Sequence, residues 1–231
     1  LQNIEQIVSE KYTSHALTVD GSIYSWGYNY YGQFGNKTTT SGNANSYPVK
    51  MQKVSNIIQI TAGEHHISML DADGSIWSTG YNSNGQFGTG TTQSENVLPT
   101  QMLDTDGSVL YGVREIASGR DHTVLIKEDN TVWSVGYNGY GQLGLGTKTN
   151  VTKPTKTNMT NIMEISAGRN HTVVLGANRV LYSTGSNSNG QLGIGTKDDK
   201  LLFTEITKVQ DMMSISSGNT YSVAIKYDGD V

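Results

Sequence analysis

Apolar and polar residues alternate over short stretches of this chain, and turn residues separate the stretches. Residues 122–126 alternate with a period of two, residues 128–131 carry turn-forming side chains, and residues 132–135 form a second apolar-rich stretch. A period of two is the spacing of a half-buried β-strand, so this segment predicts a β-hairpin. The equivalent turns elsewhere also carry residue pairs that tolerate positive φ and suit two-residue connections. These turns are Asp20-Gly21, Asp73-Gly74, Asp129-Asn130 and Asp228-Gly229.

Further strand-like segments flank each hairpin. One is expected before it, at about Ile57 to Ala62, and another after it, at about Leu98 to Leu103. A sheet of four short strands is marginal alone, whereas several such sheets stacked around an axis bury both faces and leave only short edges. The pattern therefore predicts an all-β fold with β-propeller blades of four antiparallel strands, rather than a straight solenoid.

The chain repeats itself with a period of about fifty residues. The sequence at residues 28–35, Tyr-Asn-Tyr-Tyr-Gly-Gln-Phe-Gly, returns with few changes at residues 81–88, 137–144 and 186–193. The glycine before each Gln recurs after 53, 56 and 49 residues, a spread that variable loops around a fixed unit would produce. We therefore interpret residues 1–231 as a single repeat domain. Its repeats are expected at residues 4–56, 57–112, 113–161 and 162–211, with a partial copy at 212–231.

A second marker, Ile-x-x-Gly with His three positions later, precedes each of these motifs in the later copies. A His that begins a strand after a Gly turn can donate one ring nitrogen to a neighbouring carbonyl and fill space with its other side. We therefore expect structural roles for these glycines and histidines. They are Gly63 and His66, Gly119 and His122, and Gly168 and His171. The first copy diverges, with Val8 to Glu10 in place of the motif and Thr13 in the histidine position.

Composition narrows the function classes. Hydrophobic residues make up 35% of the chain and charged residues 16%, and the 27 glycines indicate many turns. The net charge of -4 gives no electrostatic reason to bind nucleic acid. No apolar stretch reaches the length of about 18 residues that spans a bilayer, so no membrane insertion is expected. Cysteine is absent, which excludes disulfides and Cys-ligated zinc.

Catalytic and metal-binding motifs are not found. The chain has no Gly-x-Ser-x-Gly elbow, no His-Glu-x-x-His and no phosphate-binding loop, and its recurrent polar residues follow the repeat instead of marking one reaction centre. The repeated histidines lack the spacing of a metal site. The segment Asp104 to Glu115 resembles a calcium loop, but Gly107 is its fourth residue and not its sixth. We expect no enzyme activity, no cofactor and no metal.

The tips of the loops that contain the Gly-Gln motif vary between copies, and they form the candidate partner-binding surface. Tyr, Ser, Asn and Gly are favoured in binding loops because Tyr gives a large amphipathic contact area at low entropic cost. An equally weighted alternative is that these residues only form turns and cover the next blade. The long connections at residues 36–56, 89–114 and 148–161 could form a second binding face. The candidate binding residues are Tyr28, Tyr30, Tyr31, Tyr81, Asn84, Tyr137, Tyr140 and Asn189.

The motifs resemble the regulator of chromosome condensation repeat family. Its units read roughly Ser-x-Gly-x-x-His-Thr, then Asp-Gly-x-Val-Tyr-x-Trp-Gly-x-Asn, then Gly-Gln-Leu-Gly. Residues 20–29 fit the central part, and residues 119–146 fit nearly the whole unit. The resemblance implies a β-propeller of about seven blades, so four blades and part of a fifth would be a fragment of a larger ring. Such an open arc would expose apolar blade faces and could self-associate through its open edges.

Members of this family typically bind other proteins, so the resemblance implies a non-enzymatic protein–protein interaction module that uses one propeller face and its variable loops. Two alternatives rest on analogy with family members: a guanine nucleotide exchange factor for a small GTPase, and a proteinaceous enzyme inhibitor like a known bacterial propeller. Abundant Thr, Asn and Tyr without Cys is typical of a bacterial, secreted or cell-surface protein, and we expect such an origin and location.

Overall fold

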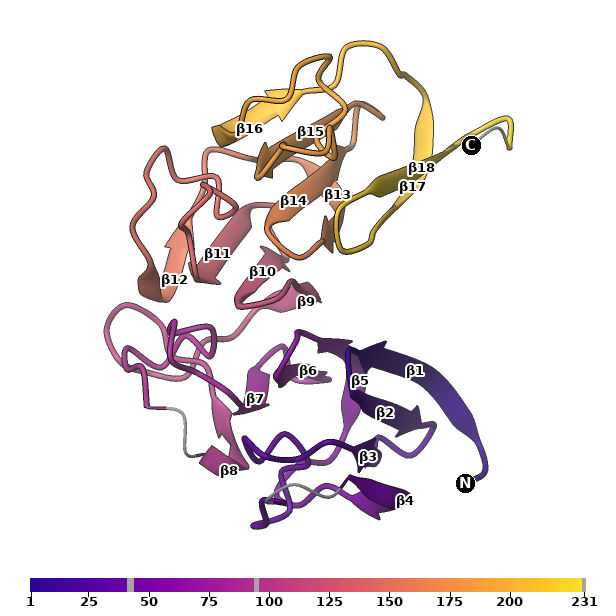
Figure 1. Ribbon diagram of the computed structural model, residues 1–231, viewed down its shortest axis with the longest axis vertical. Coiled ribbons are helices and arrows are strands. Elements are labelled where there is room, and N and C mark those ends of the chain that lie inside the picture. The colour runs from indigo at the N-terminus through magenta and orange to yellow at the C-terminus, as the bar shows by residue number, and fades with distance from the viewer. Residues whose placement is uncertain (41–43, 94–95, 230–231) are drawn as a thin grey trace.

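The fold is built entirely from short antiparallel sheets. A computed structural model describes residues 1–40, 44–93 and 96–229, and none of them lies in a helix (Figure 1). Four sheets have four strands and follow one another along the chain, and a fifth has two. The all-β prediction, with blades of four antiparallel strands and part of a fifth blade, is confirmed.

Each of the first four sheets is ordered as its strands follow in the sequence. The first contains β1 (Ile4–Glu10), β2 (Thr13–Thr18), β3 (Ile23–Gly27) and β4 (Asn45–Lys50). The second contains β5 (Ile57–Ala62), β6 (His66–Asp71), β7 (Ile76–Gly80) and β8 (Asn96–Gln101). The third contains β9 (Val113–Ser118), β10 (His122–Lys127), β11 (Val132–Gly136) and β12 (Val151–Lys156). The fourth contains β13 (Ile162–Ala167), β14 (His171–Gly176), β15 (Leu181–Gly185) and β16 (Lys200–Glu205), and the last pairs β17 (Met212–Ser217) with β18 (Ser222–Lys226).

Two details of the predicted strands change. The strand expected at Leu98 to Leu103 is β8, which begins two residues earlier at Asn96 and ends at Gln101. Met102 leaves the strand but still donates its N–H to the Ile76 carbonyl. The long connections, which could have formed a second binding face, contain β4, β8 and β12, so much of their length belongs to the blades themselves.

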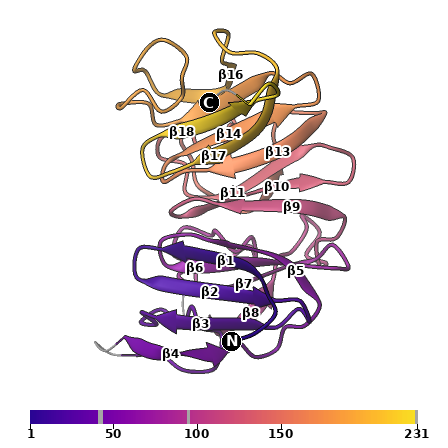
Figure 2. The same cartoon turned by 90° about the vertical axis from the view of Figure 1, so that its right-hand side faces the viewer.

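The blades fan out as an arc with their first strands on the inner side and their fourth strands on the outer rim (Figures 1 and 2). A polar side chain on each first strand bonds to the main chain of the next blade. Gln6 binds both the N–H and the carbonyl of Ile60, at 2.8 Å each. Glu115 accepts the N–H of Ile165 at 2.9 Å. Gln59 and Glu164 make the corresponding bonds to Ile116 and Ile215.

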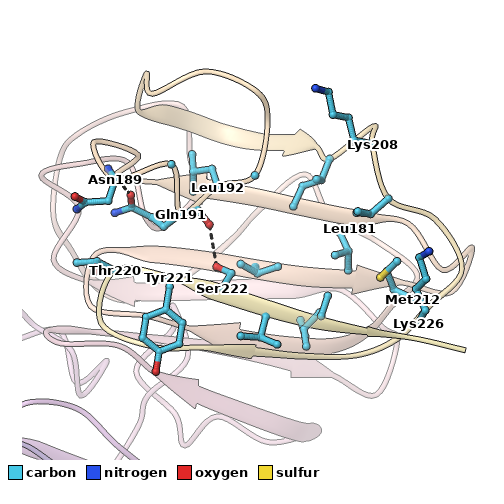
Figure 3. Close-up of a pocket in the computed structure, with 18 residues that line it drawn as sticks. Leu181, Asn189, Gln191, Leu192, Lys208, Met212, Thr220, Tyr221, Ser222 and Lys226 are labelled. Atoms are coloured by element: carbon cyan, nitrogen blue, oxygen red, sulfur yellow. Dashed lines mark hydrogen bonds between the residues drawn. The ribbon is translucent and has the colours of Figure 1, made fainter. Parts of the chain in front are cut away.

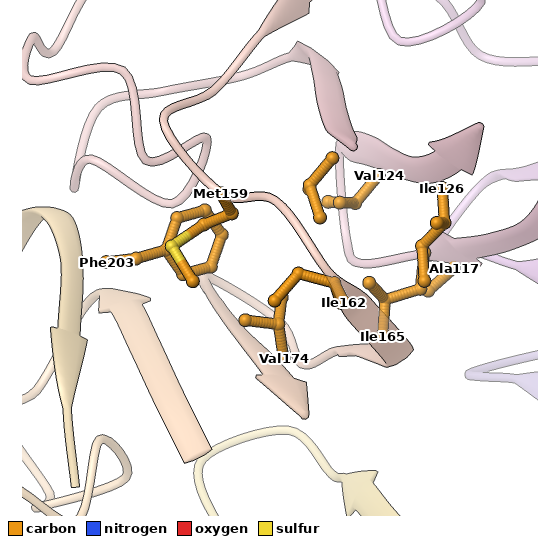
Figure 4. Close-up of a cluster of buried hydrophobic side chains, with 9 residues drawn as sticks. Ala117, Val124, Ile126, Met159, Ile162, Ile165, Val174 and Phe203 are labelled. Carbon is orange, nitrogen blue, oxygen red and sulfur yellow. The ribbon is translucent and has the colours of Figure 1, made fainter. Parts of the chain in front are cut away.

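Apolar side chains fill the space between successive blades. Between the third and fourth blades, Val124 and Ile126 of β10 face Ile162, Ile165 and Val174 of β13 and β14 (Figure 4). These five side chains are almost completely buried. Equivalent clusters lie between the other blades, so each sheet depends on its neighbours for its core. At the start of the arc, Ile7 of β1 is 64% exposed, whereas Ile60, its counterpart on β5, is buried.

The hairpin turns use the backbone conformation that their residues predict. Gly21 and Gly74 have φ of 76° and 82°, and Asn130 occupies the same turn position with φ of 60°. Asp129 stabilises its turn because its carboxylate accepts the Thr131 N–H at 3.0 Å. None of the described residues belongs to a helix long and apolar enough to cross a membrane.

Candidate functional site

The candidate binding loops leave the third strand of each blade and are held by one buried asparagine. In the third blade, Oδ1 of Asn138 accepts the Leu143 N–H at 3.0 Å, and its Nδ2 donates to the carbonyls of Thr147 and Thr149. Asn29, Asn82 and Asn187 make equivalent bonds in the other three blades. All four side chains are fully buried, so the loops are rigid parts of the blades.

A buried glutamine then fixes the residue that varies at the tip. Oε1 of Gln142 accepts the main-chain N–H of Tyr140 at 3.0 Å. The same bond joins Gln33 to Tyr31, Gln86 to Asn84 and Gln191 to Asn189. The main-chain carbonyls of three of these glutamines also anchor the tips to the next blade. Gln86, Gln142 and Gln191 accept hydrogen bonds from the hydroxyls of Thr123, Thr172 and Ser222. A constant scaffold thus presents Tyr at two of the tips and Asn at the other two.

Replacing Gln142 with alanine should loosen the third tip without unfolding the domain. The variant removes the acceptor of the Tyr140 N–H, and one such hydrogen bond contributes about 1 kcal/mol. We expect faster amide hydrogen exchange at Tyr140 and a loss of about 1 kcal/mol in the free energy of unfolding. Exchange at Asn84, which depends on Gln86, serves as the internal control and should not change. Unchanged exchange at Tyr140 would contradict the proposed role of this glutamine.

The tips of the first two blades form one aromatic cluster. Tyr31 lies at its centre, with ring centroids 5.0 Å from Tyr30, 4.9 Å from His65 and 5.0 Å from Tyr81. Tyr28 stacks on Tyr30 at 6.1 Å. Edge-to-face arrangements at such distances are favourable between aromatic rings. The structure therefore brings together Tyr28, Tyr30, Tyr31 and Tyr81, four of the residues selected from the sequence.

A cleft of about 360 Å³ lies between this cluster and the tip of the third blade. Tyr137 and Tyr140, 6.3 Å apart, form its far wall. Asn84 also lines the cleft, and its Oδ1 accepts a hydrogen bond from Asn150 at 3.2 Å. Asn189 lines a different hollow, beside β18, so the structure does not place it with the other candidates.

Charged groups lie on the inner side of the cleft. Glu64 contacts Lys11, and its Oε2 lies 2.7 Å from Nε of Arg120, which also lies 3.1 Å from Oδ2 of Asp121. Burial raises the pKa of the Glu64 carboxyl, but Lys11 and Arg120 outweigh this effect and hold the pKa below its usual value. Burial raises the pKa of Asp121 and lowers that of His65. Opposite charges thus largely balance in this part of the site.

Four further residues complete the cleft and were not selected from the sequence: His65, Arg120, Asp121 and Asn170. A signal for them exists: they occupy the two positions between the recurrent Gly and the recurrent His. The second position differs in every copy, and the first differs except that Arg120 and Arg169 are the same. The flanking positions are Gly and His in the second, third and fourth copies, so the variation between them is a usable signal. The two positions lie near the loop tips because the first and third strands of a blade end on the same side of an antiparallel sheet.

The repeated histidines and glycines pack against each other inside the blades. His66, His122 and His171 are buried, and Nε2 of the last two lies 3.1 Å and 2.9 Å from the hydroxyls of Thr172 and Ser222 in the following blade. These partners are hydroxyls and not the carbonyl expected from the sequence. Neither ring nitrogen of His66 has a hydrogen-bond partner among the described residues. We propose that these residues are structural.

A hollow of about 680 Å³ lies between the fourth blade and β18 (Figure 3). Its walls include Leu181, Ile206 and Met212, and the Ser222 hydroxyl donates to the Gln191 carbonyl at 2.9 Å at one end. Ile23, Met51 and Ile57, which occupy the equivalent positions between the first and second blades, belong to a buried core cluster. The hollow is therefore lined by residues of the core type, and the tyrosine-lined cleft is the better candidate for a functional site.

Repeated four-stranded blades, with loops that present Tyr and Asn at one end, define a protein of the β-propeller class. Residues 1–231 match the model of the RCC1-like domain, and the chain belongs to this family. It is similar to the ultraviolet-B receptor UVR8 of Arabidopsis thaliana, with 30% identity over 138 residues, 60% of this chain and 30% of the receptor. It also resembles the probable E3 ubiquitin-protein ligase HERC4 of Homo sapiens, with 33% identity over 144 residues, 61% of this chain and 13% of that protein.

Solved structures show the same fold. Human WBSCR16 has a TM-score of 0.85 and 23% identity, and the match covers 96% of this chain and 57% of that one. Prp20p from Saccharomyces cerevisiae has a TM-score of 0.82 and 25% identity, covering 96% of this chain and 55% of that one. The chain thus spans little more than half of these structures and less than a third of UVR8 and HERC4. Relatives from plants, animals and yeast give no support to the expected bacterial origin.

Proposed function

We propose that the chain is a non-enzymatic module that binds another protein through its tyrosine-lined cleft. The main observation behind this proposal is the arrangement of the loop tips. In every four-stranded blade the same hydrogen bonds from a buried Asn and a buried Gln hold the loop, while the residue at the tip varies between Tyr and Asn. Rigid aromatic side chains lose little entropy on binding, and Tyr is enriched in the central residues of protein interfaces. Prp20p, which this chain resembles, binds Gsp1p and histones, and this also supports a protein partner.

Replacing Tyr31 and Tyr140 with alanine should abolish partner capture. We expect affinity capture from cell extract, quantified by mass spectrometry, to lose its specific proteins at least about tenfold, since each anchor of this type contributes about 1–2 kcal/mol. The matched control is Tyr111→Ala, because Tyr111 is 53% exposed but lies near Gly74, at the opposite end of the blades. Equal capture by the tyrosine-cleft variant and wild type would refute the cleft as the binding site.

Exchange-factor activity is a second candidate, favoured by the similarity to Prp20p and by the binding of that protein to Gsp1p. Release of labelled nucleotide from purified Gsp1p would measure it, and no acceleration by this chain would exclude this GTPase as a substrate. The ligase activity in the name of HERC4 belongs to a protein of which this chain matches 13%. The inhibitor role, self-association of the arc and the extracellular location stay predictions.

A further inference from the structure

The residue after the recurrent glycine is charged in most blades, and main-chain hydrogen bonds join this position from blade to blade. Lys11, Glu64, Arg120, Arg169 and Asn219 occupy it in chain order. The Glu64 N–H donates to the Arg120 carbonyl at 3.1 Å, the Arg120 N–H to the Arg169 carbonyl at 3.2 Å, and the Arg169 N–H to the Asn219 carbonyl at 3.3 Å. Arg120 and Arg169 are therefore direct neighbours on the third and fourth blades.

Both arginines line a hollow of about 90 Å³ that lies where the first strands of the blades end. Arg120 also lines the tyrosine-lined cleft, so the two spaces adjoin. Ser118 and Ser217 line the hollow as well, and their buried hydroxyls have no hydrogen-bond partner among the described residues. Buried polar groups are nearly always hydrogen-bonded. The hollow is therefore suited to a polar occupant.

Arg169 adds a positive charge to a group that is otherwise balanced. Lys11 and Arg120 pair with Glu64, and Arg120 also lies close to Asp121. The exposed side chain of Arg169 forms no ion pair among the described residues. Two neighbouring guanidinium groups repel each other, so an anion between them would be stabilised. The inner side of the site thus has unpaired positive charge, although the whole chain carries a net charge of -4.

Glu10 is the carboxylate that could offset this charge, because it lines the same hollow. It forms no ion pair with Arg169 among the described residues. Burial and the nearby Glu64 raise the pKa of Glu10, and the opposing effects of Arg169 and Lys11 are smaller. Glu10 therefore neutralises Arg169 only in part.

The exposed charges determine which sign of partner charge is favoured. The side chains of Lys11 and Arg120 are 40% and 39% exposed, whereas those of Glu64 and Asp121 are 8% and 11% exposed. An approaching partner therefore meets positive groups first, and the carboxylates lie beneath them. Complementary charge on a partner both speeds encounter and selects the correct partner.

We propose that Arg120 and Arg169 form a carboxylate-binding subsite at the inner end of the tyrosine-lined cleft, and that it takes an acidic side chain of the partner protein. The subsite rests on the proposed function, since the acidic residue lies beside the segment that the tyrosines hold. Guanidinium groups bind carboxylates through parallel, charge-assisted hydrogen bonds, and the Ser118 hydroxyl supplies a further donor. The hollow has about three times the volume of one water molecule in the liquid, which is enough for a carboxylate group.

The test titrates the complete isotope-labelled chain with the peptide acetyl-Phe-Gly-Glu-amide, which carries a ring for the tyrosines and a carboxylate for the arginines. We expect the Nε–H resonances of Arg120 and Arg169 to shift at millimolar peptide. The matched peptide acetyl-Phe-Gly-Gln-amide has nearly the same shape without the charge, and it should bind about tenfold more weakly.

Three variants assign this preference to the subsite. Arg169→Gln should bind the Glu and Gln peptides almost equally, and it should unfold at the same temperature as wild type because the Arg169 side chain makes no hydrogen bond or ion pair among the described residues. Glu10→Gln should bind the Glu peptide more tightly, because a competing negative charge is removed. Lys208→Gln is the matched control, since this exposed lysine lines neither the cleft nor the hollow and its loss should leave both affinities unchanged.

Three results would overturn the subsite: no shift at Arg169, equal binding of the Glu and Gln peptides by wild type, or tighter binding of acetyl-Phe-Gly-Lys-amide. Affinity capture separates this outcome from failure of the proposed function. If the Tyr31 and Tyr140 variant loses the captured proteins and Arg169→Gln retains them, the cleft binds the partner and the acidic subsite is wrong. If capture survives loss of the tyrosines while the Glu peptide still depends on Arg169, the proposed function is wrong and the carboxylate preference stands.

Discussion

Replacing Gly119 with alanine is expected to cost about 3 kcal/mol of the free energy of unfolding, at the upper end for an overpacked core. A Cβ at this position would lie 2.1 Å from Cε1 of His122 and 2.4 Å from the carbonyl oxygen of Gly168 in the next blade. The second neighbour is main chain and cannot move without separating the blades. Chemical denaturation of the variant measures the loss.

Two variants control this experiment. Gly112→Ala also adds a methyl group at a glycine, but nothing lies within 4 Å, so only the φ of 73° opposes it and about 1 kcal/mol should be lost. Adding His122→Thr to Gly119→Ala should recover part of the loss, since Glu10 and Thr13 occupy the corresponding positions in the first blade. If the stability losses of the two single substitutions simply add in the double variant, the His122 ring is not the reason why position 119 requires glycine.

Acid is expected to unfold the protein between about pH 6 and pH 4, because four histidines are buried in the neutral form. Burial lowers the pKa to about 3 for His15, His66 and His122 and to about 4 for His171, from an ordinary value of 6.5. The unfolded chain therefore binds more protons below pH 6.5. The stability is fully present above that pH and is lost as the pH falls toward the folded-state values.

The size of the effect follows from proton linkage. Each neutral histidine costs about 1.4 kcal/mol of stability per pH unit in this window, so four exhaust a typical stability of about 5–15 kcal/mol within one to three units. Burial raises the pKa of Glu10, Glu115 and Asp121, which opposes the loss at the lower end of the window. The free energy of unfolding should therefore depend most steeply on pH above the pH range in which these three carboxyls become protonated.

Measuring the free energy of unfolding against pH tests this account of the histidines. The slope between pH 6 and pH 5 should correspond to about four protons, and His66→Gln should lower it by about one. His66 is the suitable position because its ring nitrogens have no hydrogen-bond partner among the described residues. A domain that stays folded at pH 3 would contradict the buried neutral state.

The sequence predicts the blades well because each is specified locally. Period-two strands, Asp-Gly turns and the repeat define the sheets, and the divergent first copy even shows the coupling between glycine and histidine, where Glu10 and Thr13 replace both. The inter-blade bonds of Gln6 and Gln59 were not predicted, since they join residues 54 and 57 positions apart.

The candidate site was only partly predictable for the same reason. Tyr31 and Tyr81 carry the tip motif and could be selected, but their contact with each other and with His65 depends on how neighbouring blades stack. Asn189 has the same local sequence as Asn84, yet its blade borders β18 and places it beside another hollow. Local sequence defines the tips, and blade packing decides which of them meet.

Amide hydrogen exchange of the chain, alone and with the partner recovered by capture, tests the central claim most directly. Binding at the tyrosine-lined cleft predicts new protection at residues 28–32, 81–85 and 137–141, with no change at the hairpin turns at the opposite end. Protection at those turns, with the tips unchanged, would contradict the claim.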